Sequence, residues 1–419
     1  MRVAVVGSGV SGLVASWMLQ REHEVTLFEA EARLGGHTHT VTVPAGPGGA
    51  DIDVDTGFIV FNRRTYPLFC RMLATLGVGA RDSDMGFSVQ VEANGVEYCG
   101  RGMGGLFAQK RNWLRPAHWR MIRDLLRFYR EAPALLEGEE DPTLGEYLRR
   151  NGYSRVFIDE HLVPMAAAVW SADPAGILAF PARTLVRFFR NHGFLDVKDR
   201  PTWLTVPGGS HRYVEALIAD FGGTVRTGAP VRQVARDTTG VSLTLDGGEV
   251  AQFDQVVIAT HGDTALRMLA SPTPREQEVL SRFSFQANDV ILHTDVSLLP
   301  RTEATWSAWN YFVPRDGAER ATVTYWMNQL QGLESPKPLL VTLNRRDEID
   351  PATILGEYDY DHPVFDQGAV AAQERHAEIS GADRIHYAGA WWRYGFHEDG
   401  VWSAVRVAEA LGVSEEVLG

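Results

Sequence analysis

Cysteine and lysine are scarce in this chain of 419 residues, and it has neither long apolar runs nor an excess of basic residues. The two cysteines, Cys70 and Cys99, form no CxxC pair and no zinc or iron–sulfur spacing, which is typical of a reduced cytoplasmic protein. No apolar run approaches the roughly 18 residues that a membrane-spanning helix needs. The formal net charge of −13 argues against a protein that binds nucleic acid broadly. The 13 histidines show no HExxH or other paired spacing, so no metal site is predicted.

The strongest local pattern lies in the first thirty residues. Residues 3–6 are an all-apolar run typical of a strand in a parallel sheet, and Gly7-Ser8-Gly9-Val10-Ser11-Gly12 joins this run to a helical stretch. A second strand over 24–29 ends on Glu29. The glycines permit a tight turn and the approach of a pyrophosphate to the helix N-terminus, and a carboxylate at Glu29 suits a ribose diol. The pattern predicts a dinucleotide site without distinguishing NAD from FAD.

The residues after Glu29 narrow the choice of cofactor. Arg33-Leu34-Gly35-Gly36-His37 resembles the Arg-x-Gly-Gly-Arg extension of the flavin-containing amine oxidase, phytoene desaturase and protoporphyrinogen oxidase superfamily, with His37 replacing the second arginine. The resemblance continues in order through 53–57, 207–210, 255–260 and 387–389. It implies FAD. Ala390 stands where the family usually has an acid, so backbone groups, Glu398 or Asp399 would serve that region.

By this resemblance, FAD-binding residues come from all of these segments. They are Gly7, Gly9, Val10, Ser11, Gly12, Glu29, Ala30, Arg33, Gly35, Gly36, His37, Thr56, Gly57, Val231, Ala259, Gly389, Asp399, Gly400 and Val401. Noncovalent FAD is the expectation, and covalent attachment through His37 or His39 is the alternative.

The predicted fold is α/β, with a Rossmann-like doubly wound FAD-binding domain and a discontinuous, mixed α+β substrate domain. Residues 1–65, 200–270 and 370–419 form the predicted FAD-binding domain. Residues 66–199 form a mainly helical part of the substrate domain, and residues 271–369 form a part made mainly of strands.

Periodicity supplies the elements within these segments. Apolar residues at helical spacing predict helices over 116–136 and 145–151. Runs rich in β-branched and aromatic residues predict strands over 289–294, 306–313, 322–327 and 339–343. Asp246-Gly247-Gly248 predicts a hairpin turn between strands over 242–245 and 249–253.

Catalytic residues are less clearly marked. Amine oxidases of this superfamily commonly place a lysine against the flavin, but the chain has no lysine between 199 and 336. His293 is the nearest titratable substitute, and a half-buried strand histidine held by a hydrogen bond is an equally weighted alternative. Tyr394 and His397 flank the closing flavin segment and are the other catalytic candidates. The predicted substrate pocket consists of Trp391, Trp392, Tyr325 and Asn328, although large aromatic residues are more often plain core.

One stretch has a charge opposite to that of the whole chain. Residues 101–130 contain eight Lys/Arg residues and one acid, Asp124, and therefore carry a net charge of +7 (8 − 1), with Trp113 and Trp119 among them. A basic segment interleaved with aromatic residues suits contact with an anionic membrane. A solvated face paired with the acidic run 137–141 is the alternative.

Four short segments, 293–295, 306–311, 325–331 and 395–400, suggest a narrower relationship. They resemble a bacterial subgroup described as predicted NAD/FAD-binding proteins or FAD-dependent oxidoreductases, whose genes often neighbour cyclopropane fatty acid synthases. The resemblance implies an oxidoreductase that dehydrogenates, or rearranges a double bond in, a hydrophobic acyl or lipid substrate. The enzyme is expected in the cytoplasm, peripheral to the inner membrane face. A flavin amine oxidase and a flavin-binding redox partner without turnover are the alternatives.

Overall fold

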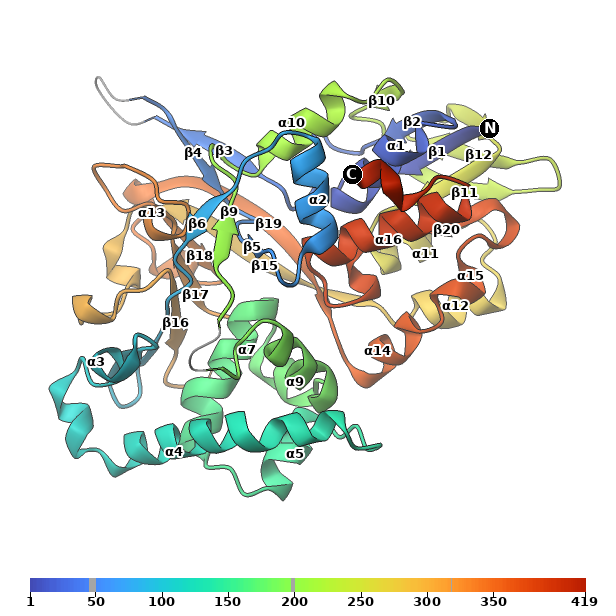
Figure 1. Cartoon of the computed structure of the whole chain (residues 1–419). Coiled ribbons are helices and arrows are strands. Elements are labelled where there is room, and N and C mark those ends of the chain that lie inside the picture. The colour runs from blue at the N-terminus through green and yellow to red at the C-terminus, as the bar shows by residue number, and fades with distance from the viewer. Residues whose placement is uncertain (45–49, 197–199, 318) are drawn as a thin grey trace.

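The structure is a computed structural model that describes residues 1–44, 50–196, 200–317 and 319–419. Figure 1 shows both ends of the chain in one lobe, at the upper right, beside strands β1 and β2. A large sheet lies to the left of this lobe, and a group of helices closes the lower side of the molecule. None of the described helices is both long enough and apolar enough to cross a membrane.

A five-stranded parallel sheet forms the centre of the first lobe. Its strand order is β10-β2-β1-β14-β20. The strands are β1 (Arg2–Val6), β2 (Glu24–Phe28), β10 (Thr224–Arg226), β14 (Gln255–Ile258) and β20 (Ile385–Tyr387). Every neighbouring pair is parallel, which confirms the predicted α/β class. The strands come from all three predicted FAD-binding segments, while the boundaries of those segments stay a prediction.

Alternation along β1 explains how the sheet is covered on both sides. Val3 and Val5 pack with α1 (Val10–Leu19) and α16 (His397–Ala410). Ala4 and Val6 face the opposite core, which includes side chains of β12 (Val241–Leu245) and β13 (Val250–Phe253). Strands β11 (Val231–Arg236), β12 and β13 form a small antiparallel sheet there. The predicted hairpin turn is confirmed, since Gly247 and Gly248 both have positive φ.

The second lobe contains a seven-stranded sheet with the order β19-β15-β18-β17-β16-β7-β8. Its strands are β7 (Phe87–Val91), β8 (Val96–Cys99), β15 (Ser284–His293), β16 (Trp309–Val313), β17 (Val323–Trp326), β18 (Leu340–Leu343) and β19 (Ile354–Val364). The four strands predicted over 289–343 are present as β15 to β18. The sequence prediction missed β19 and also the hairpin β7–β8, so the mainly helical segment contributes two strands to this sheet.

Helices occupy the rest of residues 102–191. They are α3 (Gly102–Leu106), α4 (Pro116–Glu131), α5 (Leu144–Arg150), α6 (Arg155–Phe157), α7 (Val163–Trp170), α8 (Pro174–Ala179) and α9 (Ala182–Asn191). The predicted helix over 116–136 is an α-helix only to Glu131 and continues as a 3₁₀ helix, Ala132–Leu136. Pro133 accounts for the change, because it has no N–H for the α-helical ladder.

Shorter elements connect the lobes and complete the first one. They are β3 (Thr40–Val43), β4 (Ile52–Asp55), β5 (Phe61–Asn62), β6 (Arg81–Ser83), β9 (Trp203–Thr205), α2 (Pro67–Thr75), α10 (His211–Ala219), α11 (Gly262–Met268), α12 (Pro274–Leu280), α13 (Met327–Leu330), α14 (Gln367–Gln373) and α15 (His376–Ile379). Helix α2 packs against α16, so the chain between the lobes lies beside the last helix.

Candidate cofactor site and substrate cavity

The glycine turn between β1 and α1 packs directly on the end of β14. Gly7 has a φ of 101°, and a Cβ there would lie 2.9 Å from the carbonyl oxygen of Ala259. A Cβ on Gly12 would lie 1.9 Å from the carbonyl oxygen of Gly7. Neither position has room for a side chain, so these glycines bring the helix start onto the carboxyl ends of the parallel strands. Ligands bind at this edge of doubly wound sheets.

Gly9 differs from its neighbours because it faces open space. It is the N-cap residue of α1 with a φ of −63°, no side chain caps this helix end, and a Cβ on Gly9 would meet no atom within 4 Å. The first N–H groups of α1 are therefore available to a ligand, and they carry the positive end of the helix dipole. A diphosphate fits this position.

Glu29 lies at the end of β2 with its carboxylate held in place. Its Oε2 accepts hydrogen bonds from the backbone N–H of Ser8 (2.8 Å) and from Ser8 Oγ (2.5 Å), and Oε1 accepts from the N–H of Glu31 (2.9 Å). A carboxylate has about four acceptor positions, so positions remain for a ribose diol. The residue predicted to bind the ribose is thus oriented beside the glycine turn.

The Gly35–His37 turn lies against the same helix end. The N–H of Gly35 donates to the carbonyl of Ser8 (3.0 Å), and a Cβ on Gly36 would lie 3.1 Å from the Cα of Gly9. A Cβ on Gly57 would lie 2.1 Å from the carbonyl oxygen of His37, so the segment with Thr56 and Gly57 packs onto this turn. The turn therefore contacts Gly9, and the segment with Thr56 and Gly57 contacts the turn.

The N-terminus of α16 completes the arrangement. A Cβ on Gly400 would lie 2.5 Å from Cγ1 of Val10 and 3.0 Å from Oγ of Ser11, so the starts of α1 and α16 are in contact. Ser403 Oγ accepts from the N–H of Gly389 (2.9 Å), which joins β20 to this helix. Two helix N-termini, glycines without room for side chains and an oriented carboxylate converge here, and these residues fit FAD.

The other predicted cofactor residues lie around this centre. Arg33 donates to the carbonyl of Thr38 (3.4 Å), Ala30 is exposed beside Glu29, and Val401 is fully buried in α16. Val231 is the first residue of β11. Two residues before it, the N–H of Ala229 donates to the carbonyl of Glu29 (2.8 Å), so the start of β11 lies close to the end of β2.

Histidines from three separate elements gather beside the Gly35–His37 turn. The ring centroid of His37 lies 5.3 Å from that of His362 and 6.2 Å from that of His261. Burial lowers the pKa of His37 well below its usual range and lowers the pKa of His362 to about 4. His37 therefore offers a neutral hydrogen-bonding group where the family has an arginine. His39 lies apart from this group, and its Nδ1 bonds the hydroxyl of Tyr360 (2.8 Å).

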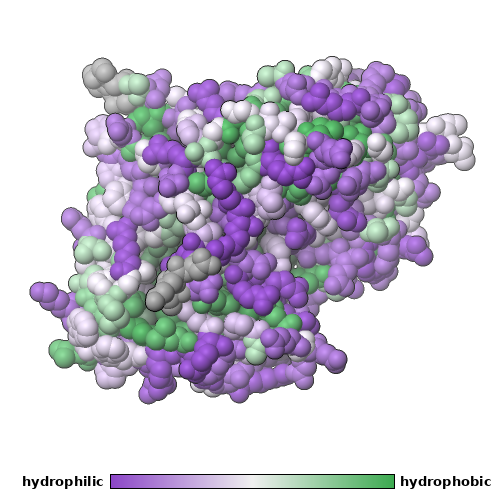
Figure 2. All heavy atoms as spheres, viewed as in Figure 1, coloured by the Kyte–Doolittle hydropathy of each residue, from purple (hydrophilic) through white to green (hydrophobic). Residues whose placement is uncertain are grey.

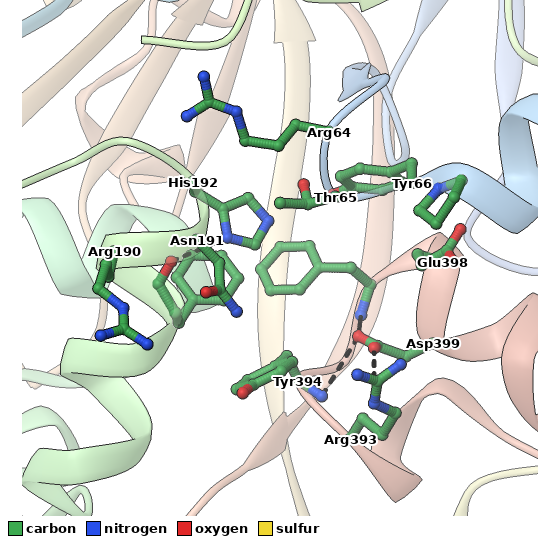
Figure 3. Close-up of a pocket in the computed structure, with 13 residues that line it drawn as sticks. Arg64, Thr65, Tyr66, Arg190, Asn191, His192, Arg393, Tyr394, Glu398 and Asp399 are labelled. Atoms are coloured by element: carbon green, nitrogen blue, oxygen red, sulfur yellow. Dashed lines mark hydrogen bonds and ion pairs between the residues drawn. The ribbon is translucent and has the colours of Figure 1, made fainter. Parts of the chain in front are cut away.

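A cavity of about 470 Å³ lies between α9, the start of α2 and the segment that leads into α16. The residues lining it are Arg64, Thr65, Tyr66, Pro67, Phe188, Arg190, Asn191, His192, Arg393, Tyr394, Phe396, Glu398 and Asp399. Figure 3 shows the His192 ring between Arg64, Asn191 and Tyr394, with Arg190 and Arg393 at opposite sides. The cavity adjoins Gly400, and it therefore lies next to the predicted flavin segment.

Asp399 fixes the turn that forms one wall of this cavity. Its Oδ2 accepts from the N–H groups of Tyr394 (3.2 Å) and Phe396 (3.0 Å), and Oδ1 lies 3.7 Å from Nε of Arg393 (Figure 3). Burial raises the pKa of this carboxyl to about 7. Asp399 is therefore a positioning residue whose charge is partly neutralised at neutral pH.

We expect Asp399→Ala to be less stable than Asp399→Asn by about 2 kcal/mol, because alanine leaves two backbone N–H groups without an acceptor. Asparagine keeps one acceptor oxygen. Urea unfolding at neutral pH, followed by circular dichroism, measures the difference. Equal stability of the two variants would contradict the positioning role.

The catalytic candidates occupy three different environments. Tyr394 lines the cavity. The Nε2 of His397 lies 3.0 Å from both the Thr38 and the Tyr213 hydroxyl, its ring stacks on Phe58, and burial lowers its pKa to about 3. His293 is fully buried, with Nε2 bonded to Thr342 Oγ1 (2.7 Å) and Nδ1 accepting from the N–H of Asp295 (3.1 Å). The structure does not bring His293 to the cavity, and both of its ring nitrogens have partners.

The predicted pocket residues are not among those that line this cavity. Trp391 and Trp392 are buried in the core under the parallel sheet, with ring centroids 4.4 and 5.0 Å from that of Phe283. Tyr325 is buried in the core of the second lobe. Asn328 accepts from the N–H of Leu339 and donates to the carbonyl of Leu333, so it stabilises a turn. Which face such residues present depends on packing between distant segments.

Sequence reasoning missed the residues that α9 contributes to the cavity. Phe188, Arg190 and His192 lie at or just after the end of this helix, in a segment whose apolar residues recur at helical spacing. That periodicity predicts the helix, but nothing local indicates that its end meets the segment before α16. Among the described residues, no group of three or more His, Cys, Asp or Glu side chains is arranged to hold a metal ion.

Comparisons with known proteins match this chain to a family profile and to curated sequences. The profile of the flavin containing amine oxidoreductase family matches residues 10–352. Flavin-containing monoamine oxidase AofH of Mycobacterium tuberculosis, a provisional name, is 28% identical over 286 residues, or 61% of this chain and 56% of that protein. The chain therefore spans about half the length of the curated relatives it matches.

Solved structures with the same fold carry the names of different enzymes. Putrescine oxidase bound to putrescine has a TM-score of 0.69 at 17% identity, covering 98% of this chain and 99% of that chain. A provisionally named protoporphyrinogen oxidase from Exiguobacterium sp. 255-15 has a TM-score of 0.71 at 17% identity, covering 98% of each chain. A CLA-producing fatty acid isomerase from P. acnes has a TM-score of 0.65 at 14% identity, covering 97% of this chain and 98% of that chain. At these identities the likeness shows the fold.

Proposed function

Because this chain belongs to the flavin containing amine oxidoreductase family, whose members use FAD, we propose that it is an FAD-dependent oxidoreductase acting on a hydrophobic acyl or lipid substrate. The proposed reaction is dehydrogenation, or a redox-neutral rearrangement of a double bond. Bound FAD supplies the electron sink for such chemistry. The proposal includes the division into a three-segment FAD-binding domain and an inserted substrate domain.

The charged residues that line the cavity are the main evidence for the proposed substrate class. The lining contains three arginines, Arg64, Arg190 and Arg393, against two carboxyl groups, Asp399 and Glu398, and burial raises the pKa of both carboxyl groups. The Glu398 carboxylate also accepts from the N–H groups of Leu68 and Phe69. Such a lining attracts a carboxylate or phosphate and repels a protonated amine. It therefore favours an acyl substrate with an anionic head group.

The aromatic part of the lining suits the acyl chain. Phe188 and Phe396 stack with ring centroids 5.0 Å apart, and Phe188 lies 5.6 Å from Tyr394. These rings offer apolar surface to methylene groups and exclude water from the reacting bond.

We assign His192, rather than a lysine, as the group that takes a proton from the substrate. Its Nδ1 lies 2.9 Å from the carbonyl oxygen of Phe188, which only accepts, so Nδ1 carries the hydrogen and Nε2 is the basic atom. Burial lowers the pKa of His192 to about 4, so the ring is neutral at neutral pH. Tyr394, in the segment that leads into α16, supplies a hydroxyl group that can hold a proton on another wall of the same cavity.

Anaerobic mixing of the yellow protein with free fatty acids, phospholipids and amines tests the substrate class. A dehydrogenated acyl chain bleaches the flavin stoichiometrically, and a rearranged double bond yields a product isomer without net bleaching. Fatty acids or phospholipids should react. Bleaching of the flavin by a polyamine, but by no lipid, would contradict the proposed acyl substrate. The protein would then be an amine oxidase, the second candidate function, which the similarity to AofH supports.

Arg190→Gln should raise the KM for the acyl substrate by about tenfold or more, because a charge-assisted hydrogen bond contributes about 1.5–3 kcal/mol. Steady-state kinetics with the reacting lipid measures the change. Arg149→Gln, which removes the same charge from α5 in the same lobe, serves as the matched control and should leave KM unchanged. An equal effect of both variants would point to long-range charge and against head-group binding by Arg190.

A further inference from the structure

Exposed apolar side chains are concentrated on one corner of the molecule. Of the nine large apolar side chains exposed in the described part of the chain, five lie in residues 103–126. They are Met103, Trp113, Leu114, Trp119 and Leu126, and Leu114 is 87% exposed. Figure 2 shows apolar side chains at the lower left edge, where Figure 1 places α3 and the start of α4. A soluble surface rarely gathers such residues without a partner.

The two tryptophans on this corner are held rigidly. The Trp113 ring stacks on Phe107 with centroids 4.0 Å apart, and Trp119 lies 4.9 Å from Phe107 and 5.6 Å from Trp113. Trp119 Nε1 also donates to the carbonyl of Trp113 (3.0 Å). Half of the Trp113 surface nevertheless remains exposed. Preorganised tryptophans with one apolar and one polar side suit the interface between lipid head groups and acyl chains.

Basic side chains surround this apolar corner, and several have no carboxylate partner. Within the described residues, no carboxylate lies at ion-pair distance from Lys110, Arg111, Arg115 or Arg120. Arg111 and Arg115 instead donate to backbone carbonyls of Gly95 and Asn94. In the acidic run 137–141, the Glu140 side chain pairs with Arg150. The described contacts thus give no support to pairing between this run and residues 101–130.

We propose that residues 101–130, which we call the docking corner, bind the surface of an anionic lipid bilayer. The apolar side chains enter the head-group region, and the unpaired cations face lipid phosphates. The net charge of +7 on the docking corner is complementary to anionic lipids. Because the rest of the chain is acidic, this corner is the part of the molecule that an anionic membrane attracts. The inference does not depend on the substrate proposed above, because it rests on a surface separate from the cavity.

The position of the docking corner also connects it to the cavity. Helix α4 continues into the 3₁₀ helix Ala132–Leu136, which packs against α9, and the end of α9 lines the cavity. One layer of structure therefore joins the membrane-facing surface to the substrate site.

Co-sedimentation of the flavoprotein with vesicles tests the proposal. We expect binding to phosphatidylcholine vesicles that contain phosphatidylglycerol, weak binding to pure phosphatidylcholine, and loss of binding at high salt because salt screens surface charge. The double variant Lys110→Gln/Arg120→Gln should weaken partitioning about 25-fold, as each cation near the surface contributes about 1 kcal/mol, or about fivefold. Leu114→Ser should weaken it further.

Matched controls come from the first lobe. Arg275→Gln/Arg406→Gln removes the same charge from exposed positions, and Val250→Ser removes an exposed apolar side chain, so both should bind like wild type. No binding to phosphatidylglycerol vesicles at low salt, or equal losses in test and control variants, would overturn the proposal. A dimer in sedimentation velocity that Leu114→Ser dissociates would also overturn it, in favour of a second copy of the chain as the partner.

Discussion

Gly9→Val should yield a folded protein that no longer retains FAD. A Cβ at this position meets no atom within 4 Å, and the φ of −63° is accessible to any L-residue, so the protein itself tolerates the side chain. The cost at a helix N-cap should not exceed about 1 kcal/mol. The added methyl groups occupy the space where a diphosphate approaches α1. Loss of two or more charge-assisted hydrogen bonds, at about 1.5–3 kcal/mol each, weakens FAD binding at least ~100-fold.

Flavin absorbance of the purified variant and its titration with FAD measure the effect, and urea unfolding without added FAD measures stability. Gly79→Val is the matched control, because a Cβ there also meets no atom within 4 Å and the residue lies away from α1. This control should retain flavin. A Gly9→Val protein with stoichiometric flavin would contradict the assignment of the diphosphate site to the start of α1.

The arrangement of the candidate cofactor edge could be predicted from the sequence because its geometry is local. Gly7, Gly9 and Gly12 lie within one turn and one helix start, and a parallel sheet places the carboxyl end of β2, with Glu29, beside them. The later segments, among them 53–57 and 207–210, resemble the family in their order along the chain, and the structure brings these two segments into contact. Asp55, for example, accepts from the N–H (2.9 Å) and Oγ (2.8 Å) of Ser210.

The cavity could not be predicted because its walls come from residues far apart in the chain. Arg64, His192 and Tyr394 meet only after both insertions have folded against the FAD-binding sheet. For the same reason, the sequence could not show which way Trp391 and Trp392 face after the Gly389 turn. An apolar pair beside a cofactor glycine can line a pocket or fill the core beneath the sheet, and here both rings pack against Phe283 in the core.

At pH 4, His161→Phe should be more stable than wild type by about 3 kcal/mol, whereas at pH 7 the two should agree within about 1 kcal/mol. The His161 ring is buried and stacks between Tyr98 and Phe157. The Tyr98 hydroxyl donates to the carbonyl of Glu160 (2.7 Å), so its oxygen accepts from Nδ1 of His161, while Nε2 is buried without a partner. Protonation would bury an unpaired N–H and a charge, and burial accordingly lowers the pKa of His161 to about 4.

The sign of the pH dependence follows from that lowered pKa. Between pH 6.5, the usual pKa of histidine, and pH 4, the unfolded chain binds a proton at this site that the native state refuses, so wild-type stability falls as the pH falls. Each pKa unit corresponds to about 1.4 kcal/mol, which gives the expected 3 kcal/mol. Phenylalanine keeps the stacking and cannot be protonated. Urea unfolding of the FAD-saturated proteins at both pH values measures the difference.

Tyr98→Phe separates the charge from the hydrogen bond. It removes the same Tyr98–His161 bond and keeps the histidine, so it should lower stability at pH 7 by about 1 kcal/mol and still lose as much stability as wild type on acidification. His161→Phe should therefore remove the pH dependence of stability, whereas Tyr98→Phe should lower stability and keep that pH dependence. If His161→Phe lost as much stability as wild type between pH 7 and pH 4, the acid sensitivity would have to arise from other buried groups, such as His192 or His362.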